Sequence, residues 1–333
     1  MKKSTRNIFI GLGAVAAGIT AVTAVSCTVT KKLVKVALDR EQPKARKKSE
    51  DKLTGSAGQM KQFERELTEA AENLKNSECE TAEITAYDGI KLVGHLRRCK
   101  DEKRLIVAMH GWRSSWYSDF GAISEFLNAN GCSVLYAEQR GQGESGGEYM
   151  GFGLTERYDC FEWVKWAKEN GYADIPIYLC GISMGAATVL MTAGLELPEN
   201  VKGIIADCGY TSPHAIWKHV VEENLHIPFS GINYVVANDM CKKKIQMGTK
   251  EYSSTDAMRN CRVPVLFVHG TDDRFVPVEM TYENYKACTA PKRLLIVPGA
   301  EHGMSYLIDK DAYKKTLKEF FEDFDGYNPE VSK

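Results

Sequence analysis

The stretch IPIYLCGISMGAATVL, residues 175–190, decides the fold. Its first six residues are apolar and partly β-branched, which is typical of a strand buried on both faces. From Ala186 onward the residues are small and apolar, and they predict a helix. A strand, the pattern Gly-x-Ser-x-Gly and a helix in this order predict a sharp turn that holds Ser183 in a strained backbone conformation. Gly181 and Gly185 are then needed because the strand and the helix pass too close together for side chains.

Apolar runs of strand length alternate with helical stretches along most of the chain. The runs lie at 104–109, 132–137, 175–180, 201–206, 263–268 and 293–297. Before them, residues 82–99 predict a β-hairpin that turns at Asp88-Gly89. This alternation predicts an α/β fold, a mostly parallel sheet flanked by helices. Functional side chains are then expected at the carboxyl ends of the strands.

Length and charge limit the classes of function. The 333 residues, with a net charge of -1 and 44% hydrophobic residues, fit one large α/β domain with appended segments. A charge this balanced gives no reason to expect nucleic acid as a partner. The run GQGESG at 141–146 matches the glycine pattern of dinucleotide-binding proteins. More glycines follow where the phosphate-binding helix would begin, so we expect a loop there and no cofactor.

The N-terminal segment differs in composition from the rest. No charged residue occurs between Arg6 and Lys31, and residues 8–29 are apolar or small. At about 1.5 Å per residue, this stretch is long enough to cross a hydrocarbon layer of about 30 Å as a helix. We therefore predict that residues 1–30 are a single-pass transmembrane anchor in the cell membrane. The alternative is a signal segment that is cleaved, or lipidated at Cys27.

The next segment, residues 31–58, is rich in charged residues and predicts a linker to a main domain at 59–325. Basic residues after the predicted span outnumber those before it, which favours the cytoplasmic side for the main domain. The ten cysteines lack the spacing of a compact disulfide framework and favour the same side. A short basic tail before the span also occurs in exported domains, so both sides stay open.

Two later motifs supply partners for a reactive serine. A serine hydroxyl needs a base to take its proton, and the base needs an acid to orient it. HGTDDRFVP (269–277) follows a strand-like run and contains Asp272 and Asp273, while GAEHGMSY (299–306) follows another and contains His302. The chain order is therefore serine, aspartate, histidine, as in α/β-hydrolases.

With these motifs, the chain resembles the α/β-hydrolases over roughly residues 80–322. It is most similar to the bacterial serine aminopeptidase-like and Bem46-type hydrolases, especially their membrane-anchored members. The motifs that carry the resemblance are HGWRSS (110–115), EQRGQGESGG (138–147), GISMG (181–185), DCGYTS (207–212), HGTDDRFVP (269–277) and GAEHGMSY (299–306). The resemblance implies that Asp273, rather than Asp272, is the acid and that Asp207 is structural.

An oxyanion hole is expected beside the serine. The strand-like run RLIVAM leads into His110-Gly111, so the backbone N–H of Trp112 is expected to bind the oxyanion together with that of Met184. His110 is expected to hold its loop through a hydrogen bond rather than to act as a second base.

The resemblance also implies a helical cap over the site, at about 213–252. Its aromatic residues are expected to line an acyl or aryl pocket for a small-molecule acyl substrate, lipid-like compounds included. The three histidines of this insertion have no acidic or cysteine partners at metal-binding spacing, so no metal is expected.

Taken together, the motifs predict a serine hydrolase that cleaves an ester or related acyl bond through an acyl-enzyme on Ser183. One alternative is a peptidase or amidase of the serine aminopeptidase type. It would need groups in the cap to bind a peptide amine, for which Glu222 and Glu223 are the candidates. The other alternative is a binding module without catalytic activity.

Overall fold

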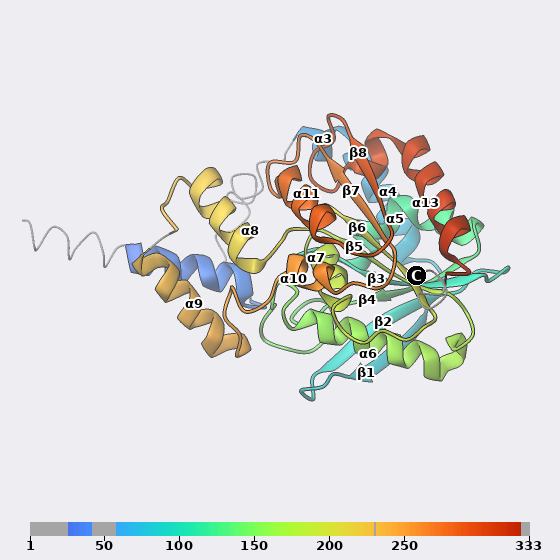
Figure 1. Cartoon of the computed structure of the whole chain (residues 1–333), viewed down its shortest axis with the longest axis horizontal. Coiled ribbons are helices and arrows are strands. Elements are labelled where there is room, and N and C mark those ends of the chain that lie inside the picture. The colour runs from blue at the N-terminus through green and yellow to red at the C-terminus, as the bar shows by residue number, and fades with distance from the viewer. Residues whose placement is uncertain (1–25, 42–57, 230, 328–333) are drawn as a thin grey trace, which may run out of the picture.

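A single eight-stranded sheet forms the centre of the molecule (Figure 1). The computed structural model describes residues 26–41, 58–229 and 231–327. The strands are β1 (Glu80–Thr85), β2 (Lys91–Arg97), β3 (Arg104–Met109), β4 (Cys132–Ala137), β5 (Ile177–Ile182), β6 (Val201–Asp207), β7 (Val265–Gly270) and β8 (Lys292–Val297). Their order is β1-β2-β4-β3-β5-β6-β7-β8, with β3 to β8 parallel and the β1–β2 hairpin antiparallel. The mostly parallel sheet predicted from the sequence is confirmed.

Two strands lie two residues later than the apolar runs predicted. The run 175–180 becomes Ile177–Ile182, and the run 263–268 becomes Val265–Gly270. Pro176 and Pro264 directly precede these strands; each has no N–H to donate, although its carbonyl accepts from the neighbouring strand. Both strands therefore begin after the proline and extend into the residues that carry the site.

Helices cover both faces of the sheet and form two apolar cores with it. One face packs against α6 (Glu156–Ala167), α7 (Met184–Thr192), α10 (Ser254–Arg259) and α11 (Val278–Ala287). The other packs against α4 (Glu64–Lys75), α5 (Trp116–Ala129) and α13 (Lys310–Phe324). Along β3, Leu105 and Val107 belong to the first core, and Ile106 and Ala108 to the second. This alternation follows from the two-residue period of a strand. The short elements are α3 (Gly58–Gln62), turn η2 (Lys168–Tyr172) and α12 (Ser305–Ile308).

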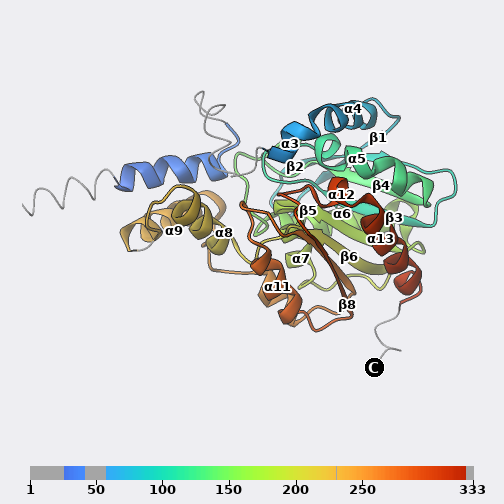
Figure 2. The ribbon, with the colours of Figure 1, turned by 90° about the horizontal axis from the view of Figure 1, so that it is seen from above.

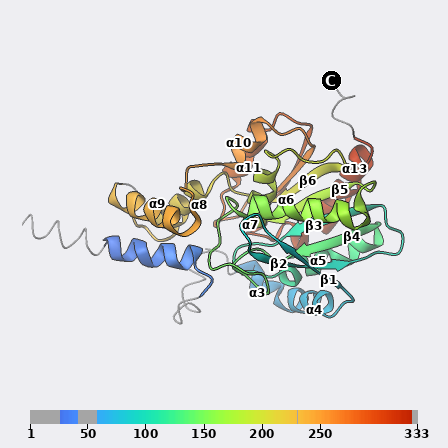
Figure 3. The same cartoon turned by 90° about the horizontal axis from the view of Figure 1, so that it is seen from below.

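A third cluster lies at one end of the molecule, where the carboxyl ends of the parallel strands meet. Between β6 and α10 the chain forms α8 (Pro213–His219), the π-helical turn η3 (Val220–Asn224) and α9 (Ile232–Ile245). Residues 26–38 form a helix that runs beside α8 and α9 in all three views (Figures 1, 2 and 3). Its Val34 and Leu38 are buried in this cluster.

The prediction of a linker over residues 31–58 is wrong for residues 31–38, which are helical and packed. Val34 and Leu38 are spaced by one helical turn and are buried, whereas Lys31, Lys32 and Lys35 are exposed. The linker was predicted because the lysines make the segment rich in charge. In the structure these lysines occupy only the outer face of an amphipathic helix.

The predicted transmembrane helix lies mostly in residues that the structure does not describe. Residues 1–25 and 42–57 are outside the described ranges. Among the described residues, no helix is both long enough and apolar enough to cross a membrane.

Candidate active site

Ser183 occupies a sharp turn between β5 and α7. Its backbone has φ 56° and ψ -114°, a positive φ that residues other than glycine rarely adopt. A Cβ atom at Gly181 would lie 2.2 Å from the carbonyl of Gly185, and one at Gly185 would lie 1.8 Å from the carbonyl oxygen of Met109. The two glycines therefore permit the close approach of strand and helix that projects the serine from the end of the sheet.

The three residues of the predicted triad come together from three separate loops. Ser183 Oγ lies 2.9 Å from His302 Nε2, and His302 Nδ1 lies 2.7 Å from Asp273 Oδ2. With Nδ1–H donating to the carboxylate, Nε2 of His302 is free of a proton and accepts the serine hydroxyl. This arrangement suits the transfer of a proton from the serine to the histidine.

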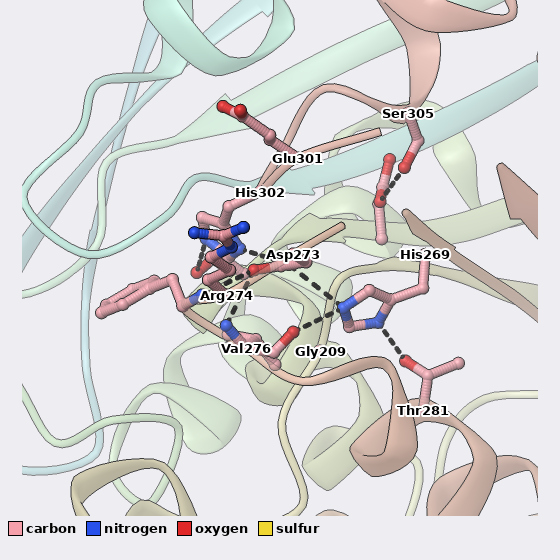
Figure 4. Close-up of polar contacts among 12 residues, drawn as sticks. Gly209, His269, Asp273, Arg274, Val276, Thr281, Glu301, His302 and Ser305 are labelled. Atoms are coloured by element: carbon pink, nitrogen blue, oxygen red, sulfur yellow. Dashed lines mark hydrogen bonds and ion pairs between the residues drawn. The ribbon is translucent and has the colours of Figure 1, made fainter. Parts of the chain in front are cut away.

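Asp273 is buried and surrounded by hydrogen-bond donors (Figure 4). The backbone N–H groups of Phe275 and Val276 donate to Oδ1 at 2.9 and 2.8 Å, and His269 Nε2 lies 3.1 Å from Oδ2. Burial alone would raise the pKa of this carboxyl group. The charge of His302 and the hydrogen bonds from both histidines outweigh burial and lower the pKa below its ordinary value. Asp273 is therefore ionised at neutral pH.

His269 was not identified from the sequence as a site residue. It is fully buried at the end of β7, where Nε2 lies 2.8 Å from the carbonyl oxygen of Val276 and Nδ1 lies 2.7 Å from the hydroxyl of Thr281 (Figure 4). The carbonyl requires a proton on Nε2, which then also points to Asp273. His269 thus holds the acid from the side opposite His302. The motif HGTDDRFVP contains this histidine directly before Gly270, but nothing in the sequence indicated that its side chain contacts Asp273, Val276 and Thr281.

The other two aspartates considered have different environments. Asp272 is exposed, and its carboxylate accepts from the hydroxyl of Thr271. Asp207 is buried, and the hydroxyls of Ser305 and Tyr313 donate to its two oxygens at 3.3 and 3.1 Å. Within the described part of the chain, Asp273 is the carboxylate with a hydrogen bond to His302.

A thiol lies beside the same histidine. Cys208, Asp273 and His302 each offer one ligand atom, and these atoms all lie within 4.8 Å of one another. Such a group can hold a metal ion, but both ring nitrogens of His302 are already hydrogen-bonded, to Ser183 and Asp273. Burial raises the pKa of the Cys208 thiol to about 11, so the thiol is neutral at pH 7.

The charge of Asp273 also acts on His302. Burial lowers the pKa of the imidazole, but the neighbouring carboxylate outweighs this effect and raises the pKa well above its ordinary value. The same carboxylate stabilises the imidazolium that forms when Nε2 takes the serine proton.

The loop after β3 lies against the serine. A Cβ atom at Gly111 would be 3.5 Å from Cβ of Ser183, and the N–H of Gly111 donates to Asp119 Oδ2 at 2.6 Å. The next amide in the chain is that of Trp112, one of the two predicted oxyanion donors. Met184, the other, is the first residue of α7, where backbone N–H groups have no acceptor within the helix.

His110 holds this loop in place. Its Nδ1 lies 2.8 Å from the carbonyl oxygen of Gly111, and its Nε2 accepts from the backbone N–H of Gln139 at 3.1 Å. Both nitrogens are used within the loop and its neighbour, as expected from the sequence.

The helix at residues 26–38 also contacts the loop after β3 that contains Trp112, which we call the oxyanion loop. The sequence did not indicate this contact. Trp112 Nε1 donates to the carbonyl oxygen of Ala37 at 2.9 Å, and Arg113 donates to that of Val36 at 2.7 Å. The end of this helix therefore supports the loop that carries a candidate oxyanion donor.

Comparisons with known proteins agree with this architecture. Residues 100–230 match the family model described as serine aminopeptidase, S33. The uncharacterized protein YqkD of Bacillus subtilis is 29% identical over 238 residues, which cover 72% of this chain and 77% of YqkD.

Two solved structures illustrate the likeness in fold. An esterase of Pyrococcus furiosus, Pf2001, superposes with a TM-score of 0.61 at 22% identity, covering 77% of this chain and 94% of the esterase. An acylaminoacyl peptidase of Pyrococcus horikoshii does so with a TM-score of 0.56 at 17% identity, covering 77% of this chain and 43% of the peptidase. The sheet order, the serine turn and these likenesses agree in showing an α/β-hydrolase-like fold.

Proposed function

We propose that the protein is a serine hydrolase that cleaves an ester or related acyl bond through an acyl-enzyme on Ser183. The observation that carries this proposal is the continuous path from Ser183 Oγ through His302 to Asp273, with distances of 2.9 and 2.7 Å. Both distances lie within the hydrogen-bond reach that general-base catalysis requires. The family match and the esterase-like fold support a hydrolase.

Acylation begins when Ser183 Oγ attacks the carbonyl carbon of the substrate. His302 Nε2 takes the serine proton, and Asp273 stabilises the imidazolium that forms. The carbonyl oxygen becomes negatively charged and accepts hydrogen bonds from the N–H groups of Trp112 and Met184. When this intermediate collapses, the bond to the leaving group breaks, and His302 donates its proton to the departing oxygen. The acyl group is left on Ser183.

Deacylation repeats these steps with water as the nucleophile. His302 removes a proton from the water as it attacks the acyl carbon, and then returns the proton to Ser183 Oγ. The acid product leaves and the free enzyme is restored. Neither half of the cycle requires a cofactor.

A peptidase of the serine aminopeptidase type is the second candidate, supported by the S33 match. An aminopeptidase needs an anionic group near the site to bind the free amine of the peptide. Glu222, one candidate, already accepts from the backbone N–H of Phe229 at 3.0 Å, and Glu223 is exposed on the cap. These positions favour an acyl substrate without a free amine.

A panel of substrates tests the choice between ester and peptide hydrolysis. We expect the protein to hydrolyse p-nitrophenyl esters faster than aminoacyl p-nitroanilides, in kcat/KM measured by release of the chromophore. Ser183→Ala is expected to lower kcat for the esters by about 10⁶-fold, because the serine and histidine act as one unit. Faster cleavage of the anilides would favour the peptidase. A folded wild-type protein that cleaves neither class would favour the binding module.

Substitution of the two adjacent aspartates tests the assignment of the acid. Asp273→Asn is expected to lower kcat by about 10⁴-fold, because an amide N–H facing Nδ1 stabilises the tautomer of His302 that cannot accept the serine proton. Asp272→Asn is the matched control and keeps the wild-type kcat, since its side chain is exposed and bonded only to Thr271 among the described residues. Equal losses in the two variants would contradict the assignment.

The uncharged stretch at residues 8–25, which precedes the packed helix, supports an N-terminal membrane anchor. The basic residues that follow favour the cytoplasmic side for the catalytic domain. Full-length protein is then expected to sediment with membranes and to stay there in high salt or alkaline carbonate, because apolar insertion is insensitive to both. Protein that begins at Ser26 is the control, and it should remain in the supernatant. Release of the full-length protein by salt alone would contradict the anchor.

A further inference from the structure

An apolar pocket lies between the cap, which consists of α8, η3 and α9, and the helix at residues 26–38. About 700 Å³ of space not filled by atoms lies among its lining residues, part of it open to solvent. Leu33, Val36 and Ala37 form one wall, and residues of α8 and η3, including Trp217 and Val221, form the opposite wall. All lining side chains except Thr30 are apolar or aromatic. The pocket therefore suits a hydrocarbon group.

Two residues next to the candidate catalytic residues line the pocket. Trp112, which carries a predicted oxyanion donor, is part of its lining, as is Phe275. The ring of Phe275 packs edge-on against the ring of His302, with 5.0 Å between centroids. The pocket therefore lies beside the candidate site, on the side of Trp112 and Phe275.

Hydrogen bonds and an ion pair fix both ends of the helix at residues 26–38, which forms one wall of the pocket. At its start, the hydroxyls of Ser26 and Thr30 donate to Asn233 Oδ1 of α9 at 2.7 and 3.1 Å. At its end, the carbonyl of Ala37 accepts from Trp112 at 2.9 Å, and Asp39 forms an ion pair with Lys244 at 2.8 Å. These contacts connect the helix to both the cap and the oxyanion loop, so its pocket-facing side chains have a fixed position relative to Ser183.

We propose that the pocket-facing side chains of Leu33, Val36 and Ala37 form part of the acyl-chain site and that the substrate is an ester of a long-chain fatty acid. This proposal rests on the proposed hydrolase activity for its chemistry, but the pocket is defined by residues outside the triad. A charged acyl group finds no charged side chain in the lining and would lose its hydration on entry. An aliphatic chain gains the burial of each methylene group that the pocket covers.

Tryptophan substitutions on the two sides of the helix test the proposal through hydrolysis. Leu33→Trp fills the pocket, so the ratio of kcat/KM for p-nitrophenyl dodecanoate to that for the acetate is expected to fall by roughly 100-fold. This corresponds to lost contact with three or four methylene groups. Val36→Trp, on the same wall, serves as a second variant in case the first does not fold. Lys35→Trp adds the same bulk to the exposed face and keeps the wild-type ratio.

Binding of dodecanoate to the Ser183→Ala protein, measured by calorimetry, separates the pocket from the chemistry. We expect binding that is lost when Leu33→Trp is added and kept when Lys35→Trp is added. Ester hydrolysis without this binding, or with a ratio unaffected by Leu33→Trp and Val36→Trp, would overturn the pocket proposal and leave the hydrolase proposal standing. Binding that depends on Leu33, in a wild-type protein that hydrolyses no ester, would support the pocket and overturn the hydrolase.

Discussion

The close packing of helix α7 against strands β3 and β5 is the constraint on which the candidate site depends. Gly185 lies against the carbonyl of Met109 so closely that a Cβ atom would be 1.8 Å from its oxygen, and Gly181 approaches Gly185 in the same way. Only at such a short separation does the chain turn from strand to helix within one residue, with Ser183 at φ 56°. The strained serine is therefore maintained by the packing of the sheet around it.

Much of the fold could be predicted from residue patterns because each pattern is local. The buried parallel strands appear as apolar runs, and the turn of the β1–β2 hairpin appears as Asp88-Gly89. The order of Ser183, Asp273 and His302 indicated three loops at one edge of the sheet, and the structure brings these loops together. Strand ends were less predictable, since Pro176 and Pro264 moved two of them by two residues.

The contacts that the sequence did not indicate join residues far apart in the chain. His269 Nε2 lies against both the carboxylate of Asp273 and the carbonyl oxygen of Val276. The carbonyl can only accept, so Nε2 carries the proton that also supports Asp273. Residues 31–38 looked like a linker because their lysines dominate the composition, yet Val34 and Leu38 pack into the cap. A helix whose first residues belong to the predicted membrane anchor thus forms a wall of the pocket and supports Trp112. No local pattern carries that information.

Covalent labelling by a fluorophosphonate tests the account most directly, because the probe needs the activated serine and the oxyanion donors together but no knowledge of the substrate. We expect peptide mass spectrometry to find one phosphonate adduct, on Ser183, in the folded wild-type protein. Ser183→Ala and His302→Ala proteins should show none at this position, and neither should wild-type protein unfolded before labelling. Folded wild-type protein without an adduct on Ser183, or with equal labelling in the His302→Ala variant, would contradict the account.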